Sequence, residues 1–196
     1  MAMPSEQSQP LDPATLREIA ARIDHAERTR TQIRQISIEH PQISIEDAYA
    51  IQREWIALKL AGNQVRRGRK IGLTSRAMQE SSQINEPDYG DLLDEMFFPD
   101  GSDLPMKRFI VPRLEVELAF VLGKPLRGPN CTIFDALDAC DYVVPAVEII
   151  DARIEQRDAA TGATRKVFDT IADNAACAGV VLGGRGRRRC GRLHRG

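Results

Sequence analysis

The segment 113–122 (RLEVELAFVL) constrains the fold most, because it places two glutamates inside an otherwise apolar run. The run predicts a β-strand, in which Glu115 and Glu117 share one face about 7 Å apart. Two such carboxylates on a half-buried strand repel each other and are costly to desolvate. A hard divalent cation such as Mg²⁺ or Mn²⁺ would offset both costs. The segment therefore predicts a metal site, and it leaves open the alternative of a strand whose glutamate face is simply solvated.

Composition limits the class of protein. The chain has 196 residues, of which 42% are hydrophobic and 28% charged, as in an ordinary soluble protein. This length suits one domain, or one domain with an appended segment. No apolar run approaches the roughly 20 residues of a membrane helix, and the first residues lack the features of a secretory signal. The four cysteines show neither a CxxC motif nor the density of a disulfide framework. We therefore expect a cytoplasmic protein without a membrane partner.

The N-terminal part reads as helical. Residues 1–11 are polar and predict a disordered lead-in, and Asp12-Pro13 is a good helix start. Apolar residues then recur at roughly helical spacing from Leu16 to Ile36. A second helix is predicted from Ser44, which with Asp47 resembles a capping box, to Gly62. Its apolar stripe consists of Ala48, Ile51, Trp55 and Leu58, and we expect Trp55 in the core.

The part after residue 64 reads as rich in β-structure. Predicted strands cover 66–75, which contains Gly72, then 113–122, 141–150 and the end of 175–184, with a short helix at 132–140. Residues 76–105 predict a long irregular loop with an apolar tip at 96–98, and 151–169 a second loop. We therefore expect an α+β fold with a helical segment at 12–64, a β-rich mixed-sheet core at 65–184 and a separate tail at 185–196.

A third carboxylate completes a candidate metal triad. Glu148 lies in a predicted buried strand, where an unpaired carboxylate needs a cation or a tight partner. Together with Glu115 and Glu117 it suits the octahedral oxygen preference of Mg²⁺ or Mn²⁺. The three histidines lie far from this pattern, which argues against a zinc site. Lys70 is the candidate for a base or for an electrophilic contact, since burial beside a metal lowers a lysine pKa; the alternative is a surface lysine in a basic run.

Four motifs stand out in the sequence: KIGLTSRAM at 70–78, EPDYGDLLDEMFF at 86–98, RLEVELAFVL at 113–122 and PAVEIIDARI at 145–154. Together they resemble the fumarylacetoacetate hydrolase superfamily, and within it the hydratases of aromatic meta-cleavage pathways. The resemblance runs from about Asp12 to Arg185. It implies the superfamily's mixed-sheet core and a homo-oligomer.

The resemblance also implies site residues and a reaction. Glu115, Glu117 and Glu148 would hold Mg²⁺ or Mn²⁺, and the catalytic residues would be Lys70 and Asp88, the latter an acid in the loop. The implied reaction is ketonisation of a 2-hydroxy-2,4-dienoate followed by addition of water at C4, with the metal stabilising the enolate. For a seven-carbon dicarboxylate substrate, the far carboxylate needs a cation, for which the candidates are Arg76, Arg153, Arg165 and Lys166.

Two related activities compete with hydration. Decarboxylases of the 4-oxalocrotonate type also use a metal to stabilise an enolate, and the motifs distinguish them poorly from hydratases. Acylpyruvate hydrolases of the superfamily use a Glu-His pair, but no histidine lies between Ile43 and Leu193. This argues against hydrolytic C–C cleavage.

The tail departs from the superfamily pattern. Residues 185–196 (RGRRRCGRLHRG) contain six arginines and no acid, whereas the remaining 21 basic and 28 acidic residues give the first 184 a net charge of −7. We expect an out-of-frame tail on a chain truncated at its C-terminus, and hence a 196-residue protein that is poorly soluble or inactive. The rival hypothesis is a non-catalytic chain whose basic tail binds an acidic partner; with no interleaved aromatic residues, we expect no nucleic-acid partner.

Overall fold

The computed structural model describes residues 9–184 and 187–188. The helices are α1 (Pro13–Thr29), α2 (Ile36–Glu39), α3 (Ile45–Ala61), α4 (Arg76–Ser81), α5 (Ile133–Ala139) and α6 (Val167–Ala172), with short 3₁₀ turns η1 (Asp94–Met96), η2 (Met106–Arg108) and η3 (Asn174–Ala176). The strands are β1 (Arg66–Gly72), β2 (Asp88–Leu93), β3 (Phe97–Phe98), β4 (Arg113–Leu122), β5 (Cys140–Ile150), β6 (Cys177–Leu182) and β7 (Arg187–Arg188). The predicted α+β class is confirmed.

The N-terminal helices begin where the sequence predicts. The Asp12 carboxylate accepts hydrogen bonds from the first backbone N–H groups of α1, and Ser44 forms the predicted capping box with Asp47 in α3. Asp47 also accepts from the backbone N–H of Leu11, which ties down the end of the predicted lead-in. Residues 1–8 and most of the predicted tail lie outside the described residues.

The first helix is shorter than its apolar periodicity predicts. It ends at Thr29, because Arg30 takes a left-handed conformation in which its N–H caps the carbonyls of the last turn. The backbone of Ile33 instead pairs with Arg153 and Glu155 at 2.9 Å each, and Ile36 begins α2. Tertiary pairing with a distant segment therefore overrides the helical pattern here.

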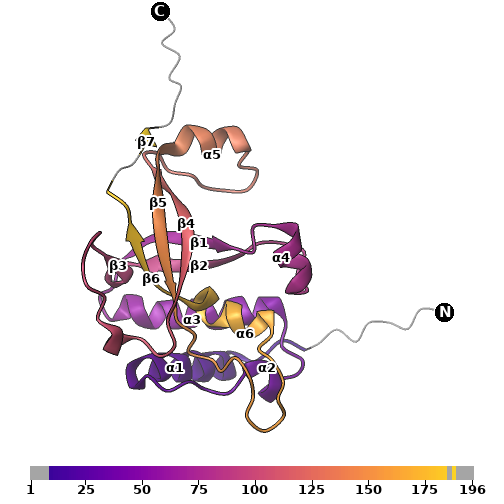
Figure 1. Cartoon of the computed structure of the whole chain (residues 1–196). Helices are drawn as coiled ribbons and strands as arrows, with labels where there is room; N and C mark the ends of the chain where they lie inside the picture. Colours follow the sequence, from indigo (N-terminus) through magenta and orange to yellow (C-terminus); the bar gives the residue numbers. More distant parts are fainter. Residues whose placement is uncertain (1–8, 185–186, 189–196) are drawn as a thin grey trace, which may run out of the picture.

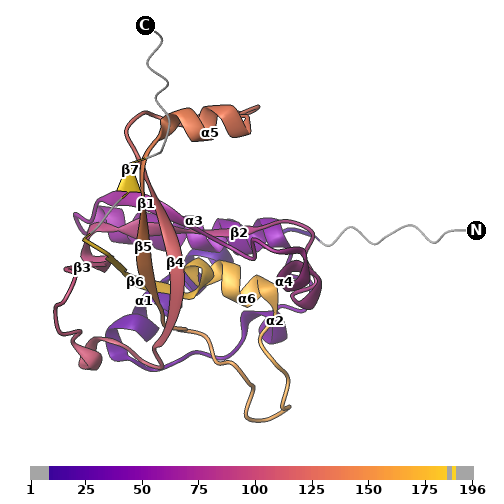
Figure 2. The same ribbon diagram turned by 45° about the horizontal axis from the view of Figure 1, so that its top comes forward.

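Helices α1, α2, α3 and α6 form one layer that shares a core with later parts of the chain. Trp55 is fully buried as predicted, whereas Leu58, placed in the same stripe, is 46% exposed. The core also contains Leu93, Ile154 and Ile171, and α6 packs beside α3 (Figures 1 and 2). The domain division at residue 64 stays a prediction. No helix in the described part of the chain is both long and apolar enough to cross a membrane.

The strands form two sheets. β1 and β2 pair antiparallel, and a second sheet has the order β3-β6-β5-β4, with β7 beside β5. The prediction of one long loop at 76–105 was wrong, because this segment contains α4, β2 and β3. Its apolar tip is not exposed: Met96 is buried in the core, and Phe97 and Phe98 pair with Val180 and Val181 of β6. Pairing partners far along the chain thus order a segment whose own sequence is rich in turn residues.

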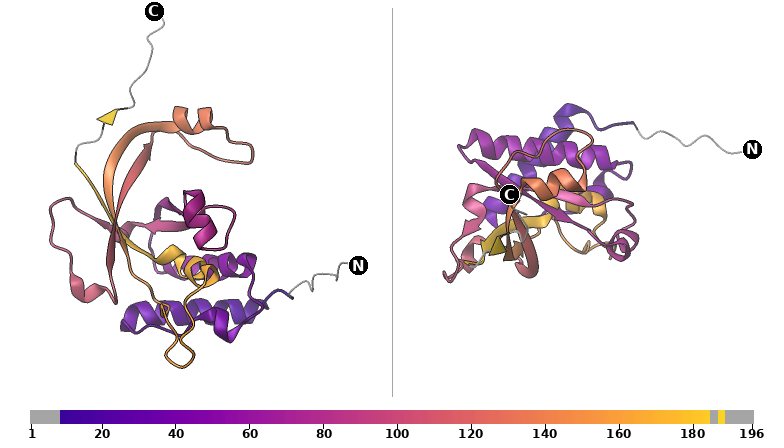
Figure 3. Two further views of the ribbon diagram at one scale, coloured as in Figure 1. Left: turned by 45° about the vertical axis from the view of Figure 1, so that its right-hand side comes forward. Right: turned by 90° about the horizontal axis from the view of Figure 1, so that it is seen from above.

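The ribbon of β4 and β5 rises away from the helical layer and ends near α5 (Figures 1 and 3). Among the described strands, β4 pairs only with β5. The expectation that β4 is half-buried was wrong, since nearly all its residues are exposed, including the apolar side chains of Val116 and Phe120. Its partner strand β5 is buried at several positions, which include Glu148.

Candidate metal centre

Three glutamates converge on the β4–β5 ribbon. Glu115 lies directly opposite Glu148 in the antiparallel register, and Glu117 is two residues along on the same face of β4. One carboxylate oxygen from each of the three lies within 4.8 Å of the others. Glu115 and Glu117 are exposed, whereas Glu148 is 6% exposed. The structure therefore brings together the three residues that the sequence singled out as metal ligands.

The buried glutamate is held by an ion pair. The Nζ of Lys70 lies 3.1 Å from Oε1 of Glu148. Burial raises the pKa of Glu148, although the charge of Lys70 opposes this. Three hard carboxylates that converge within 4.8 Å form a donor set that fits Mg²⁺ or Mn²⁺.

Lys70 is a site lysine rather than a surface one. It lies in β1, and its ammonium donates a hydrogen bond of 3.0 Å to the carbonyl oxygen of Ala175. Burial lowers its pKa, but the neighbouring acidic groups, with Glu148 first among them, together outweigh this and raise the pKa above its ordinary value. The expected lowering is therefore not produced by the described protein groups, because the site surrounds the lysine with acids.

Asp88 lies in a strand and not, as expected, in a loop. It is the first residue of β2, is buried, and stands opposite Gly72 of β1. A Cβ on Gly72 would collide with its Oδ1, so the glycine provides room for this carboxylate. Oδ1 is also buried without a hydrogen-bond partner in the described structure. Burial raises the pKa of Asp88, with Lys70 opposing the shift.

Sequence reasoning missed two neighbours of this site. Cys177 begins β6, is fully buried, and has its pKa raised to about 12, first by burial and then by the charge of Glu148. The turn Asn174–Ala176 supplies the carbonyl that Lys70 contacts. The sequence carries only a weak signal for these residues, because small residues before a strand usually indicate packing alone.

The four cationic residues predicted to bind the far carboxylate of a dicarboxylate substrate differ in their burial and in their contacts. Arg153 is removed from the set, because it is buried and bound to Asp173 and to the carbonyl oxygen of Cys177. Arg76 and Lys166 are exposed. Arg165 is partly buried, and its Nη1 has no hydrogen-bond partner among the described residues; burial lowers its pKa.

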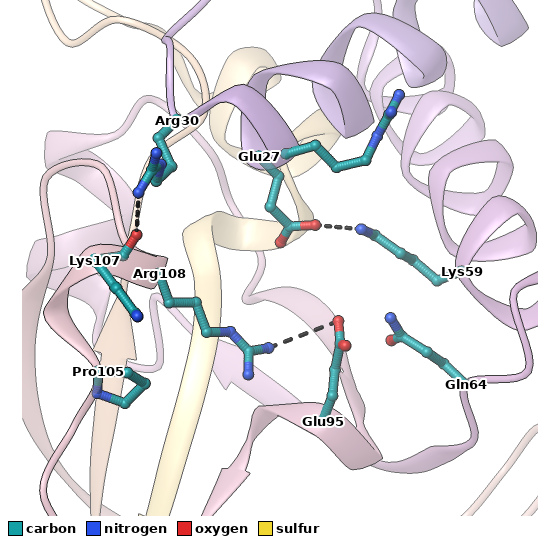
Figure 4. A pocket seen from close by; sticks show the side chains of 9 residues that line it. Glu27, Arg30, Lys59, Gln64, Glu95, Pro105, Lys107 and Arg108 are labelled. Carbon is teal, nitrogen blue, oxygen red and sulfur yellow. Dashed lines mark hydrogen bonds and ion pairs between the residues drawn. The ribbon is translucent and has the colours of Figure 1, made fainter.

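A separate pocket of about 510 Å³ lies at the C-terminal ends of α1 and α3 (Figure 4). Its lining shares no residue with the glutamate site. Most of its cations are already engaged: Lys59 pairs with Glu27, Arg108 lies 3.6 Å from Glu95, and Arg30 donates to the carbonyl of Lys107 at 2.6 Å. The first contact joins α3 to α1, and the third joins the end of α1 to η2, so the pocket is a structural junction.

Comparisons with known proteins agree with this arrangement. No protein-family model matches the chain. It is 68% identical over 167 residues to 2-oxo-hept-4-ene-1,7-dioate hydratase of Escherichia coli, covering 85% of this chain and 62% of that protein. It is 36% identical over 174 residues to 2-hydroxypent-2,4-dienoate hydratase of Pseudomonas putida, covering 88% and 76%.

Two solved structures are similar in fold to this chain. Two structures of 4-oxalocrotonate decarboxylase from Pseudomonas putida G7, one complexed with calcium and acetate and one with magnesium and adipate, match with TM-scores of 0.83 and 0.84. Both are 32% identical to this chain and cover 92% of it and 66% of their own length. The chain thus spans about 60% of the length of the first curated relatives it matches.

Proposed function

Because the chain belongs to the dienoate hydratases of the fumarylacetoacetate hydrolase superfamily, we propose that it carries the metal centre of a hydratase for 2-hydroxy-2,4-dienoates. The proposed substrate is a seven-carbon dicarboxylate, 2-oxo-hept-4-ene-1,7-dioate, hydrated to 4-hydroxy-2-oxoheptanedioate in homoprotocatechuate degradation. The name of the E. coli relative at 68% identity supports this choice.

One observation carries the proposal: one carboxylate oxygen from each of three glutamates lies within 4.8 Å of the others, beside the ammonium of Lys70. Glu115, Glu117 and Glu148 would hold the cation. The decarboxylase neighbours complexed with calcium and with magnesium support a divalent ion, and we propose Mg²⁺, with Mn²⁺ as the substitute. When bound, this cation would supply positive charge beside the oxygen on which enolate charge develops.

The remaining groups are suited to moving protons. Hydration of the dienoate needs a proton to leave the enol oxygen and another to reach carbon, before the OH and H of water add at C4 and C3. Asp88 is buried with a raised pKa, which favours a carboxyl able to hold a proton and release it. The ammonium of Lys70 lies 3.1 Å from Glu148, and its charge lowers the pKa of both Asp88 and Glu148 against the effect of burial. We assign proton transfer to these two residues.

Cation binding is the first test, because it needs no turnover and we expect the 196-residue chain to be poorly soluble or inactive. Titration with Mn²⁺, followed by electron paramagnetic resonance, is expected to show one site that Mg²⁺ displaces. Glu148→Gln should abolish it, while Glu155→Gln, which changes a glutamate outside the cluster, should not. Binding that is equal in all three proteins would overturn the proposal.

Product analysis then separates the two candidate reactions. Decarboxylation is the second candidate, favoured by the fold likeness to 4-oxalocrotonate decarboxylase. Incubation with a 2-hydroxydienoate dicarboxylate should give a 4-hydroxy-2-oxo acid that carries oxygen from labelled water, with no release of CO₂. Release of CO₂ instead would favour the decarboxylase.

The assembly of the enzyme is also a proposal. We propose a homo-oligomer with a small dicarboxylate as its partner molecule and no nucleic acid. Light scattering at increasing protein concentration tests the oligomer, and a constant monomer mass would contradict it.

A further inference from the structure

A strained turn contacts Lys70 beside the candidate metal site. Asn174, Ala175 and Ala176 have φ values of 53°, 51° and 57°, so three successive residues take the left-handed conformation. Asparagine tolerates this conformation, but it is unfavourable for alanine, whose Cβ approaches the following carbonyl oxygen. All three residues are buried. Strain of this kind persists only where the surrounding structure enforces it, and it concentrates at functional sites.

The side chain of Asn174 fastens the turn to β2. Its Oδ1 accepts a hydrogen bond of 2.7 Å from the backbone N–H of Asp91, and its Nδ2 donates one of 2.9 Å to the carbonyl of the same residue. The neighbouring Gly90 allows the approach, since a Cβ there would lie 2.5 Å from the carbonyl oxygen of Asn174. The turn therefore has a fixed position relative to β2.

That position determines where Lys70 is held. Lys70 of β1 stands opposite Gly90 of β2, and its ammonium donates to the carbonyl of Ala175, at the centre of the turn. The same ammonium lies 3.1 Å from Oε1 of Glu148. The lysine is thus fixed by one main-chain acceptor on the turn and one carboxylate on β5.

We propose that Asn174 is a positioning residue, which holds the left-handed turn so that the carbonyl of Ala175 keeps the ammonium of Lys70 beside Glu148. The role of Lys70 in hydration rests on the proposed function; the positioning of its ammonium is a separate property. Asn174 acts through the turn, since its side-chain amide is hydrogen-bonded to the backbone of Asp91.

The test measures how fast each lysine is acylated by an N-hydroxysuccinimide ester at one fixed pH, by peptide mass spectrometry. Asn174→Gly removes the amide while glycine keeps the left-handed backbone available. We expect acylation of Lys70 to rise about tenfold, the effect of losing one to two hydrogen bonds. Asn63→Gly is the matched control, because Asn63 also has a positive φ (70°) but is exposed at the end of α3. It should leave Lys70 within about twofold of the parent.

Lys59, another largely buried lysine, serves as the internal reference. Equal acceleration of Lys59 and Lys70 would mean general loosening and would overturn the proposal, as would an unchanged rate at Lys70. Should Asn174→Gly fail to fold, Asn174→Asp preserves the shape and the left-handed preference but loses the amide donor, and a smaller selective rise at Lys70 is expected.

No step of this test needs turnover. If Asn174→Gly speeds acylation of Lys70 selectively but the parent chain binds no Mn²⁺, the proposed function is rejected and the positioning role stands. Normal Mn²⁺ binding without any selective change at Lys70 would reject the positioning role alone.

Discussion

Asp88 lies across the β1–β2 pair from Gly72, and its carboxylate occupies the space that a side chain on Gly72 would need. A glycine is therefore required at this position by a neighbouring acid rather than by a turn or a positive φ. The contact explains how a polar residue at the start of β2 can be buried against the strand that carries Lys70.

Gly72→Ala should displace Asp88 while leaving the sheet formed. We expect a loss of about 1–3 kcal/mol in the free energy of unfolding, because the new methyl group overpacks the site. Any metal-dependent hydration should fall with it. Gly68→Ala in the same strand is the control: its Cβ would meet Leu92 at an ordinary 3.6 Å, so stability should be unchanged or slightly higher. Equal effects of the two alanines in urea unfolding would refute this account.

Glu117→Gln should weaken binding of Mn²⁺ by at least about tenfold, because one of three carboxylate ligands becomes neutral. Glu117 is exposed, so its replacement should change the free energy of unfolding by less than about 0.5 kcal/mol. Isothermal titration calorimetry measures the first quantity and urea unfolding the second. An unchanged affinity would remove Glu117 from the ligand set.

Lys59 joins α3 to α1 in a largely buried ion-pair cluster. Its ammonium contacts Asp24 and Glu27 and lies 5.0 Å from the ring centre of Trp55. Lys59→Met keeps the apolar length but leaves both acids without this partner, so we expect a loss of about 1–3 kcal/mol. Lys124→Met is the control, because the Lys124–Asp138 pair is exposed and such pairs contribute little. Trp55, the one tryptophan of the chain, reports unfolding by fluorescence.

The same variant makes a prediction about alkaline pH. Burial lowers the pKa of Lys59, but Glu27 and Asp24 outweigh it, so the folded-state pKa lies above the ordinary 10.5. The unfolded chain therefore loses this proton first, and the stability that the pair contributes is present below pH 10.5 and lost as the pH rises through the folded pKa. The stability difference between parent and Lys59→Met should shrink above pH 10.5. A difference that stays constant up to pH 12 would contradict the pairing.

The apolar face of β4 should drive self-association. Val116 is 89% exposed, and β4 has a described partner on one side only; a long exposed strand edge of this kind is an aggregation site. Val116→Lys should lower the apparent mass in light scattering without loss of unfolding free energy. Val65→Lys, which changes an exposed valine just before β1, should leave association unchanged. Similar association in all three proteins would indicate that another surface is responsible.

Local sequence was enough for the features that depend on near neighbours. The capping residues Asp12, Ser44 and Thr132 begin helices where their hydrogen bonds require it, and the alternation in 113–122 predicted β4. Glu115 and Glu117 share a face for the same reason. The family likeness of the motifs around these glutamates also follows from sequence alone.

Only the tertiary structure decided the features that depend on partners far along the chain. The end of α1, the strands inside 76–105 and the burial of Asp88 each follow from pairing with distant segments. The contact between Lys70 and Ala175 joins residues 105 positions apart, and the left-handed turn that makes it has no signature in a run of small residues. Local periodicity sets which way side chains point, but the positions of carbonyls and buried charges depend on how separate strands meet.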